Sequence, residues 1–347
     1  MHIPDGYLSP QTCGTLGVAS AIVAAGASYK TAKTLKAKYI PLLSIGSAFA
    51  FLIMMFNVPI PDGTTAHAVG GGLLAVVLGP WAAFISITIA LVIQALFFGD
   101  GGILALGANV FNMAFILPFV AYGIYRLIAG RSQLTAKRRW LAAGIGGYVG
   151  INLAALAAGI ELGLQPLLFH AADGTPLYNP YGLSVAVPAM SLAHLLVAGP
   201  VEAVVTGLVV AYLQKTSPQL LELRNSTANT ANLNWRKLIP VGVLLVLLVP
   251  VGLLAPGTAW GEWGTEAIKA KLGYVPMGMQ KFADLWKPLM PGYGISGLGQ
   301  NFWQQAVGYI AAAIVGVILI LLIAVVVRRF GAKGDKKHGP SDVAPRK

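Results

Sequence analysis

The sequence predicts an all-α integral membrane protein, and three observations support this fold class. Of the 347 residues, 56% are hydrophobic. Only 10% are charged, whereas about a quarter of the residues of a soluble domain carry a charge. Apolar stretches of about 20 residues, the length that crosses a ~30 Å hydrocarbon core as a helix, recur along nearly the whole chain. We therefore expect a multi-pass protein embedded in the lipid bilayer of the cell membrane.

The basic residues predict how these helices are oriented. The formal net charge is +12, but the lysines and arginines lie in short clusters between apolar stretches rather than in one extended patch. We interpret the clusters as cytoplasmic loops according to the positive-inside rule, and we expect no nucleic-acid partner. The clusters at 30–38 and 126–139 then share the cytoplasmic side. The N-terminus is predicted outside and the C-terminus in the cytoplasm.

Nine apolar stretches are predicted to form the bundle. They lie at residues 12–29, 40–58, 68–78, 81–98, 104–128, 140–160, 183–213, 238–255 and 304–327. The third stretch is short for a membrane crossing. Because the two basic clusters share one side, an even number of crossings must lie between them. The third and fourth stretches therefore form either two helices that meet at Gly79-Pro80 or a re-entrant pair.

A polar stretch rich in serine, asparagine and threonine divides the chain into two units. Such a composition is typical of a flexible linker. The predicted units are, in chain order, a bundle of about seven helices at 1–214, a cytoplasmic linker at 215–235, a two-span unit at 236–330 with an external segment at 256–303, and a basic disordered tail at 331–347.

The start of the chain, MHIPDGYLSP, predicts a metal site. The amino group of Met1, the backbone nitrogen of His2 and the His2 imidazole can bind one ion together, which closes two fused chelate rings. This planar nitrogen set suits Ni(II), Cu(II) or Co(II) better than Zn(II). No basic residue precedes the first apolar stretch, so we expect no cleaved signal peptide and a mature chain that keeps its start. The alternative is an ordinary initiator methionine followed by a chance histidine.

A second histidine is predicted on the same side of the membrane. His67 follows a loop rich in proline and glycine after the second apolar stretch, and it can supply a fourth nitrogen to the ion. The alternative is a histidine at a helix start that bonds only to backbone. His170 also lies on this side, but its loop is expected to be exposed, so it is the weaker candidate.

Two ionisable residues lie inside the seventh stretch. His194 and Glu202 are eight residues apart and are expected to project from similar helix faces. Ionisable groups within the membrane are functional candidates by default. We favour a buried structural pair, or contacts to a partner subunit, over a second metal site. Cys13, the single cysteine, is interpreted as a buried small residue rather than a soft metal ligand.

Motifs for covalent chemistry are absent from the sequence. It contains no His-Glu-x-x-His helix of zinc proteases and no Gly-x-x-x-x-Gly-Lys-Ser/Thr nucleotide loop. We therefore expect no enzyme, no prosthetic group and no ATP hydrolysis by this chain.

Five short motifs of the sequence resemble those of the CbiM/NikM family, the cobalt and nickel substrate-specificity subunits (S-components) of energy-coupling factor (ECF) transporters. The resemblance rests on MHIPDGYLSP at the start, the loop around His67, LGPWA at 78–82, FGDGG at 98–102 and LGANVFNM at 106–113. It covers residues 1 to about 214. The segment from about 235 onward is similar to the two-span accessory subunit of the CbiN/NikN type, and the run GTAWGEWG at 257–264 supports a fused arrangement.

The resemblance implies a metal-capturing subunit that takes up Ni(II) or Co(II) from outside. It implies as ligands the Met1 amine, the His2 backbone nitrogen and imidazole, and the His67 imidazole. It also implies a transmembrane T-component and two cytoplasmic ATPase subunits as partners. Residues expected to orient the ligands are Asp5, Asp62, Asn109 and Asn112. The alternatives are a self-sufficient metal channel or secondary transporter and, less favoured, a membrane metalloenzyme.

Overall fold

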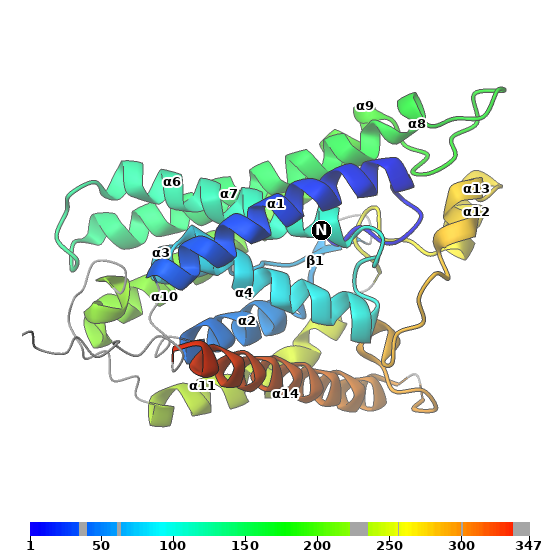
Figure 1. Ribbon diagram of the computed structural model, residues 1–347. Coiled ribbons are helices and arrows are strands. Elements are labelled where there is room, and N and C mark those ends of the chain that lie inside the picture. Colours follow the sequence, from blue (N-terminus) through cyan, green and yellow to red (C-terminus); the bar gives the residue numbers. More distant parts are fainter. Residues whose placement is uncertain (35–39, 61–63, 223–234, 256, 300, 336–347) are drawn as a thin grey trace, which may run out of the picture.

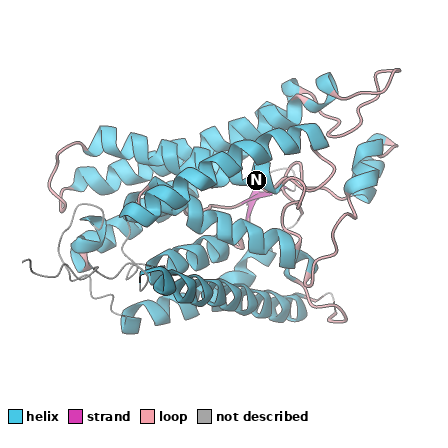
Figure 2. Ribbon diagram, viewed as in Figure 1, coloured by secondary structure: helices cyan, strands magenta, loops and turns pink. Residues whose placement is uncertain are grey.

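The computed structural model describes residues 1–34, 40–60, 64–222, 235–255, 257–299 and 301–335. Almost all of the regular structure in these residues is helical (Figures 1 and 2). The α-helices are α1 (Pro10–Thr34), α2 (Ile40–Met54), α3 (Gly71–Leu78), α4 (Pro80–Ile93), α5 (Leu106–Asn109), α6 (Leu117–Ala129), α7 (Lys137–Gly163), α8 (Gln165–Leu168), α9 (Leu183–Ala193), α10 (Gly199–Thr216), α11 (Trp235–Leu248), α12 (Thr265–Leu272), α13 (Met277–Phe282) and α14 (Phe302–Asp335).

Short segments of other types interrupt or extend these helices. The π-helical segments are η3 (Gln94–Phe98), η4 (Val110–Ile116) and η5 (His194–Ala198). The 3₁₀ segments are η6 (Pro218–Glu222), η7 (Val249–Leu254) and η8 (Pro291–Tyr293). Two short strands, β1 (Val58–Ile60) and β2 (Thr64–Ala66), pair in antiparallel register.

The predicted all-α membrane fold is confirmed. Among the described residues, six continuous helical stretches are long and apolar enough to cross a membrane. They lie at Pro10–Lys33, Pro80–Phe98, Leu106–Ala129, Lys137–Leu168, Leu183–Thr216 and Phe302–Val326. Two shorter apolar helices, at Ile40–Met54 and Ile239–Leu254, coincide with the second and eighth predicted stretches. The sidedness of the bundle and the boundaries of its units remain predictions.

The third predicted stretch is the one that is not a full helix. α3 has eight residues, about 12 Å of helix, and it meets α4 at Gly79. Residues 67–70, which form neither helix nor strand, precede it, and α3 itself is almost entirely buried against α4, α6, α7 and α10. Non-helical backbone is tolerated at membrane depth only where it is buried in protein or lines a cavity. The chain therefore enters the bundle after β2 as a buried loop and continues as a short helix.

The C-terminal unit packs along the first one and covers one of its ends. α11 and α14 pack against α2. The segment between them, which includes α12, α13 and η8, lies at the end of the bundle at which α1 begins (Figure 1). It is bonded there to the first unit, since the backbone N–H of Met290 donates to the Phe97 carbonyl at 2.9 Å and that of Gly278 donates to the Leu177 carbonyl at 2.7 Å. We call residues 257–299 the covering segment.

Candidate metal site

Seven of the first nine residues are buried, within the end of the bundle that the covering segment closes. Met1 and His2 are only 5% and 2% exposed. The carboxylate of Asp5 accepts hydrogen bonds from the backbone N–H groups of Ile103, Leu104 and Ala105 at 2.8–3.1 Å. This contact fixes the N-terminal segment to the loop that follows η3.

Asn109 holds the same segment next to His2. Its Oδ1 accepts the backbone N–H of Ile3 at 2.8 Å, and its Nδ2 donates to the Ile3 carbonyl at 3.1 Å. Both groups of the amide side chain are therefore satisfied by the backbone of one residue. The N-terminal chain is held in position because two polar side chains, the half-buried Asp5 and the buried Asn109, bind its backbone or the loop beside it.

The amino group of Met1 lies against a carboxylate from the covering segment. Its nitrogen is 3.0 Å from Oε1 of Glu262, in an ion pair. The Glu262 side chain is 22% exposed, whereas that of Met1 is 1% exposed. Glu262 thus connects the buried amino group with the protein surface, and a residue more than 250 positions away contributes to the surroundings of the chain start.

The His2 imidazole lies between two acceptors. Nδ1 is 3.1 Å from Oδ1 of Asp100, and Nε2 is 3.3 Å from Oε1 of Gln94. Burial lowers the pKa of His2 to about 4, and repulsion from the Met1 amino group adds to this effect. The ring is therefore neutral at pH 7 and carries one N–H, which can be donated to only one of the two acceptors at a time.

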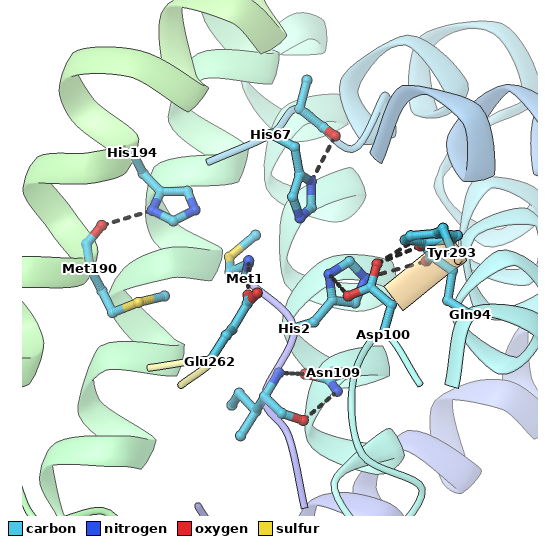
Figure 3. Close-up of polar contacts among 12 residues, drawn as sticks. Met1, His2, His67, Gln94, Asp100, Asn109, Met190, His194, Glu262 and Tyr293 are labelled. Carbon is cyan, nitrogen blue, oxygen red and sulfur yellow. Dashed lines mark hydrogen bonds and ion pairs between the residues drawn. The ribbon is translucent and has the colours of Figure 1, made fainter. Parts of the chain in front are cut away.

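The second histidine faces the first. The ring centroids of His67 and His2 are 5.0 Å apart with the planes tilted by 33° (Figure 3). Nδ1 of His67 is 3.1 Å from the carbonyl oxygen of Ala68, and its Nε2 is buried without a hydrogen-bond partner. Burial lowers the pKa of His67 well below its usual value, with repulsion from the amino group and from His2 as further causes. A neutral ring that donates from Nδ1 leaves a free lone pair on Nε2.

The candidate site therefore combines nitrogen atoms of the main chain with those of side chains and is not a cluster of side chains alone. Among the described residues, no three histidine, cysteine or carboxylate side chains converge as a conventional metal-binding group. The donors are a terminal amine, a backbone nitrogen and two imidazoles. The predicted residues Met1, His2 and His67 lie together in the structure (Figure 3). That they bind metal is still a prediction.

None of the described residues that were expected to orient the ligands is hydrogen-bonded to an imidazole. Asp5 and Asn109 bind backbone of the N-terminal segment or its neighbouring loop and contact neither imidazole. Asn112 donates to Oε2 of Glu161 at 2.7 Å instead. Asp62 lies outside the described residues. His170 is exposed and its Nδ1 is 3.0 Å from the Ala171 carbonyl, outside the contacts of the site.

The two ionisable residues of the seventh stretch do not pair with each other. Nδ1 of His194 is 2.7 Å from the carbonyl of Met190, one turn earlier. Both carboxylate oxygens of Glu202 accept backbone N–H groups from residues 69–72. Both side chains are buried and bonded to backbone, as a structural role requires. That they project from similar helix faces stays a prediction, and the π-helical segment η5 lies between them. Cys13 is buried, as expected.

Sequence reasoning did not assign four polar residues around the site. Gln94 and Asp100 contact the His2 ring, Glu262 pairs with the amino group, and the Tyr293 hydroxyl donates to Oδ2 of Asp100 at 2.5 Å. Asp100 belongs to the FGDGG run and Glu262 to the GTAWGEWG run, so the motifs themselves marked both. Gln94 begins η3 inside an apolar helix, which hid its role.

The fold and the sequence comparisons place the chain among the metal transport proteins of membranes. Residues 2–220 match the family model CbiM, described as a cobalt uptake substrate-specific transmembrane region. The match covers more than half of the chain, and the chain belongs to this family. Residues 235–332 match the PDGLE domain.

Relatives of similar length carry both units. The chain is 46% identical over 337 residues to the fused nickel transport protein NikMN of Rhodobacter capsulatus, covering 92% of this chain and 95% of the relative. It is 49% identical over 331 residues to a protein of Lactiplantibacillus plantarum named as a probable fused nickel transport protein LarMN, covering 93% and 96%. A crystal structure titled as a truncated transition metal transporter is 66% identical, with a TM-score of 0.59, covering 62% of this chain and 99% of that one.

Proposed function

We propose that this protein is the substrate-specificity subunit of an ATP-driven ECF-type nickel or cobalt importer of the cell membrane. It captures Ni(II) or Co(II) from outside with the Met1 amine, the His2 backbone nitrogen, the His2 imidazole and the His67 imidazole. The ion is transported substrate, not a resident cofactor. The observation that carries this proposal is the buried Nε2 of His67, which has no partner and points toward Met1 and His2 (Figure 3).

The hydrogen bonds of both imidazoles support this ligand set. Metal-binding histidines usually donate their second ring N–H to a carbonyl or carboxylate. His67 can donate Nδ1–H to the Ala68 carbonyl and bind metal through Nε2. His2 can close a six-membered chelate ring with its own backbone nitrogen only through Nδ1, and its Nε2–H then donates to Gln94. Metal at Nδ1 would thus resolve the competition of two acceptors for one ring proton.

Two carboxylates must give up their present contacts when the ion binds. Asp100 lies at Nδ1 of His2, and Glu262 lies at the Met1 amino group. Both remain beside the site, where their negative charge favours a divalent cation. Planar coordination by four nitrogens suits Ni(II), while Co(II) would take further oxygen ligands. Nickel is also the metal for which the two fused relatives are named.

Transport by this chain requires partners that supply energy. Its sequence contains no nucleotide-binding loop. We assign that task to two cytoplasmic ATPase subunits, joined to this chain through a transmembrane T-component. Uptake of nickel into vesicles that contain only this chain would support a self-sufficient channel or secondary transporter and would contradict the assignment.

The N-terminal amine offers the sharpest test of the site. Two glycines placed before Met1 move the free amine away from the His2 backbone nitrogen and break the fused chelate, without placing the histidine third in the chain, where a new four-nitrogen chelate would form. We expect nickel binding, measured by isothermal titration calorimetry on the purified full-length chain, to fall by at least about 100-fold. X-ray absorption of the native chain should show only nitrogen or oxygen in the nearest shell with two imidazoles.

Two histidine variants accompany this test: His67→Ala, which removes a proposed ligand, and His170→Ala, its matched control. The first should weaken binding strongly, whereas the second removes an exposed imidazole and should leave the affinity unchanged. Each variant is accepted only if it elutes as a single species and keeps the native melting temperature within a few degrees. Native affinity in the extended chain would refute the role of the amine.

A further inference from the structure

Glu202 is a buried carboxylate inside a membrane-spanning helix, and it binds the loop that carries His67. It lies in α10, within the stretch Leu183–Thr216, and is 0% exposed. Its Oε2 accepts the backbone N–H groups of Val69 and Gly70 at 2.9 and 2.8 Å. Its Oε1 accepts that of Gly72 at 2.9 Å. One side chain thereby joins α10 to three backbone groups just after His67.

The local sequence makes this contact possible. The first N–H groups of a helix lack partners within the helix, and an anion at that end is favoured by the helix dipole. Gly70, before α3, has a φ of 77°, which a side chain would strain. A Cβ on Gly72 would lie 2.7 Å from Cα of Gly147 in α7, so only glycine lets α3 approach α7 and α10 this closely.

The bonding of Glu202 argues against a second metal site on α10. Both of its oxygens already accept backbone N–H groups, and His194 bonds to the carbonyl of its own preceding turn. The carboxylate acts on the loop instead. Val69 is two residues beyond His67, and the short Nδ1 contact of His67 is to Ala68, which belongs to the same loop. The position of the His67 ring in the bundle therefore depends on where this loop is held.

We propose that Glu202 is a positioning residue for His67: it fixes the loop at residues 67–72 to α10 so that Nε2 of His67 faces Met1 and His2. The inference rests on the proposed function, because it assigns Glu202 a role only through the His67 ligand. Residues that orient metal ligands typically contribute 10- to 100-fold to affinity. Glu202 acts through the backbone of the loop and not on the imidazole itself, but it accepts three hydrogen bonds.

A double-mutant cycle tests this role on the full-length chain with its native start. The four proteins are wild type, His67→Ala, Glu202→Gln and the double variant, and the readout is Ni(II) affinity by calorimetry. We expect Glu202→Gln to lose about 10- to 100-fold in affinity. The amide keeps the size of the carboxylate but offers one acceptor in place of two. In the His67→Ala background the same change should have no further effect, because the ligand that it positions is gone.

The control for loss of a carboxylate from a membrane-spanning helix is Glu161→Gln in α7. Glu161 bonds to Asn112 and contacts neither imidazole, so nickel affinity should be unchanged. X-ray absorption supplies a second readout: nickel bound to Glu202→Gln should show fewer imidazole scatterers than the wild type. If Glu202→Gln does not yield a single folded species, Glu202→Asp, which keeps the charge but shortens the reach, takes its place in the cycle.

The outcomes separate this inference from the proposed function. If the wild type binds no nickel, or if His67→Ala keeps native affinity, the proposed function fails. If His67→Ala loses affinity but folded Glu202→Gln or Glu202→Asp binds as the wild type does, the positioning role is wrong. It is equally wrong if the Glu202 change weakens binding by the same factor with and without His67, since the two residues would then act independently.

Discussion

The two segments that carry the predicted ligands are held in different ways. Several elements bind the N-terminal segment at once. Asn109 accepts the backbone N–H of Ile3, and Gln165 accepts that of Ser9. In the covering segment, Glu262 pairs with the Met1 amino group, and the Trp263 carbonyl accepts the Tyr7 hydroxyl. The loop of His67 donates three backbone hydrogen bonds to one side chain, that of Glu202. We expect distributed contacts to make single losses small and a concentrated contact to make them large.

This contrast also separates the two units of the chain. The N-terminal ligands touch both units, because Glu262 and Trp263 of the covering segment contact Met1 and Tyr7. The His67 loop is bonded within the first unit, to α10. If the proposed site binds the ion, the position of Met1 and His2 therefore depends on the covering segment, and the position of His67 depends on the helix bundle.

The largest effect is expected where the concentrated contact is disturbed without removing a charge. In Gly72→Ala the new Cβ would lie 2.7 Å from Cα of Gly147 and 3.1 Å from Oγ1 of Thr206, so α3 must move away from α7 and α10. Overpacking of this kind costs about 1–3 kcal/mol. We expect a clear loss of melting temperature in detergent and a fall in nickel affinity.

Gly123→Ala in α6 is the matched control for that substitution. A Cβ at Gly123 meets nothing within 4 Å, and Gly123 is an interior residue of its helix. Alanine there should leave the melting temperature unchanged or raise it, by about 0.5–1 kcal/mol in stability. Equal losses of melting temperature in both variants would show that any added methyl group destabilises the bundle. The loss in Gly72→Ala would then say nothing about the contact with Glu202.

A smaller effect is expected for Asn109→Ala, which removes one of several contacts of the N-terminal segment. The backbone N–H of Ile3 loses its acceptor, while the Ile3 carbonyl keeps the N–H of Gly102 at 2.9 Å. One unpaired buried donor costs about 1–3 kcal/mol in stability, a range similar to that for Gly72→Ala, so the smaller effect is expected in nickel affinity, because the other contacts still hold the segment. Nickel affinity should fall moderately, because Ile3 adjoins His2.

Asn152→Ala is the control for the asparagine change, since Asn152 donates to the Tyr148 carbonyl of its own helix. Its effect on nickel affinity should be negligible. A loss for Asn109→Ala as large as that for Gly72→Ala would contradict the distinction between distributed and concentrated contacts.

The sequence was sufficient to predict what depends on local pattern. Apolar length gave the helices, and the unusual start of the chain together with the loop of His67 gave three residues that the fold brings together. Contacts between elements that are far apart in the chain could not be predicted from such patterns. Nothing near Glu262 shows that its partner is the Met1 amine, because that contact depends on how the covering segment crosses the bundle.

Among the described residues, three π-helical segments interrupt the regular helical spacing next to polar residues. η3 begins at Gln94, η4 follows Asn109 and contains Asn112, and η5 begins at His194. A π-helical turn has more residues per turn than an α-helix, so a regular 3.6-residue count does not hold across it. Such turns often occur at functional sites. Here each one begins at or borders a polar residue close to the predicted metal position.

The smallest effect is expected for Tyr7→Phe, which removes a single bond between the two units. The hydroxyl of Tyr7 donates to the backbone carbonyl of Trp263 at 2.8 Å, next to Glu262. A neutral hydrogen bond contributes about 0.5–1.5 kcal/mol, and the other contacts of the N-terminal segment remain. The equilibrium affinity for nickel should change by less than about tenfold. Because the bond holds the covering segment over the site, we expect release of nickel, followed by stopped-flow chelation, to be faster. An unchanged release rate would show that Tyr7 does not help to close the site, and Tyr212→Phe, at an exposed position of α10, provides the baseline.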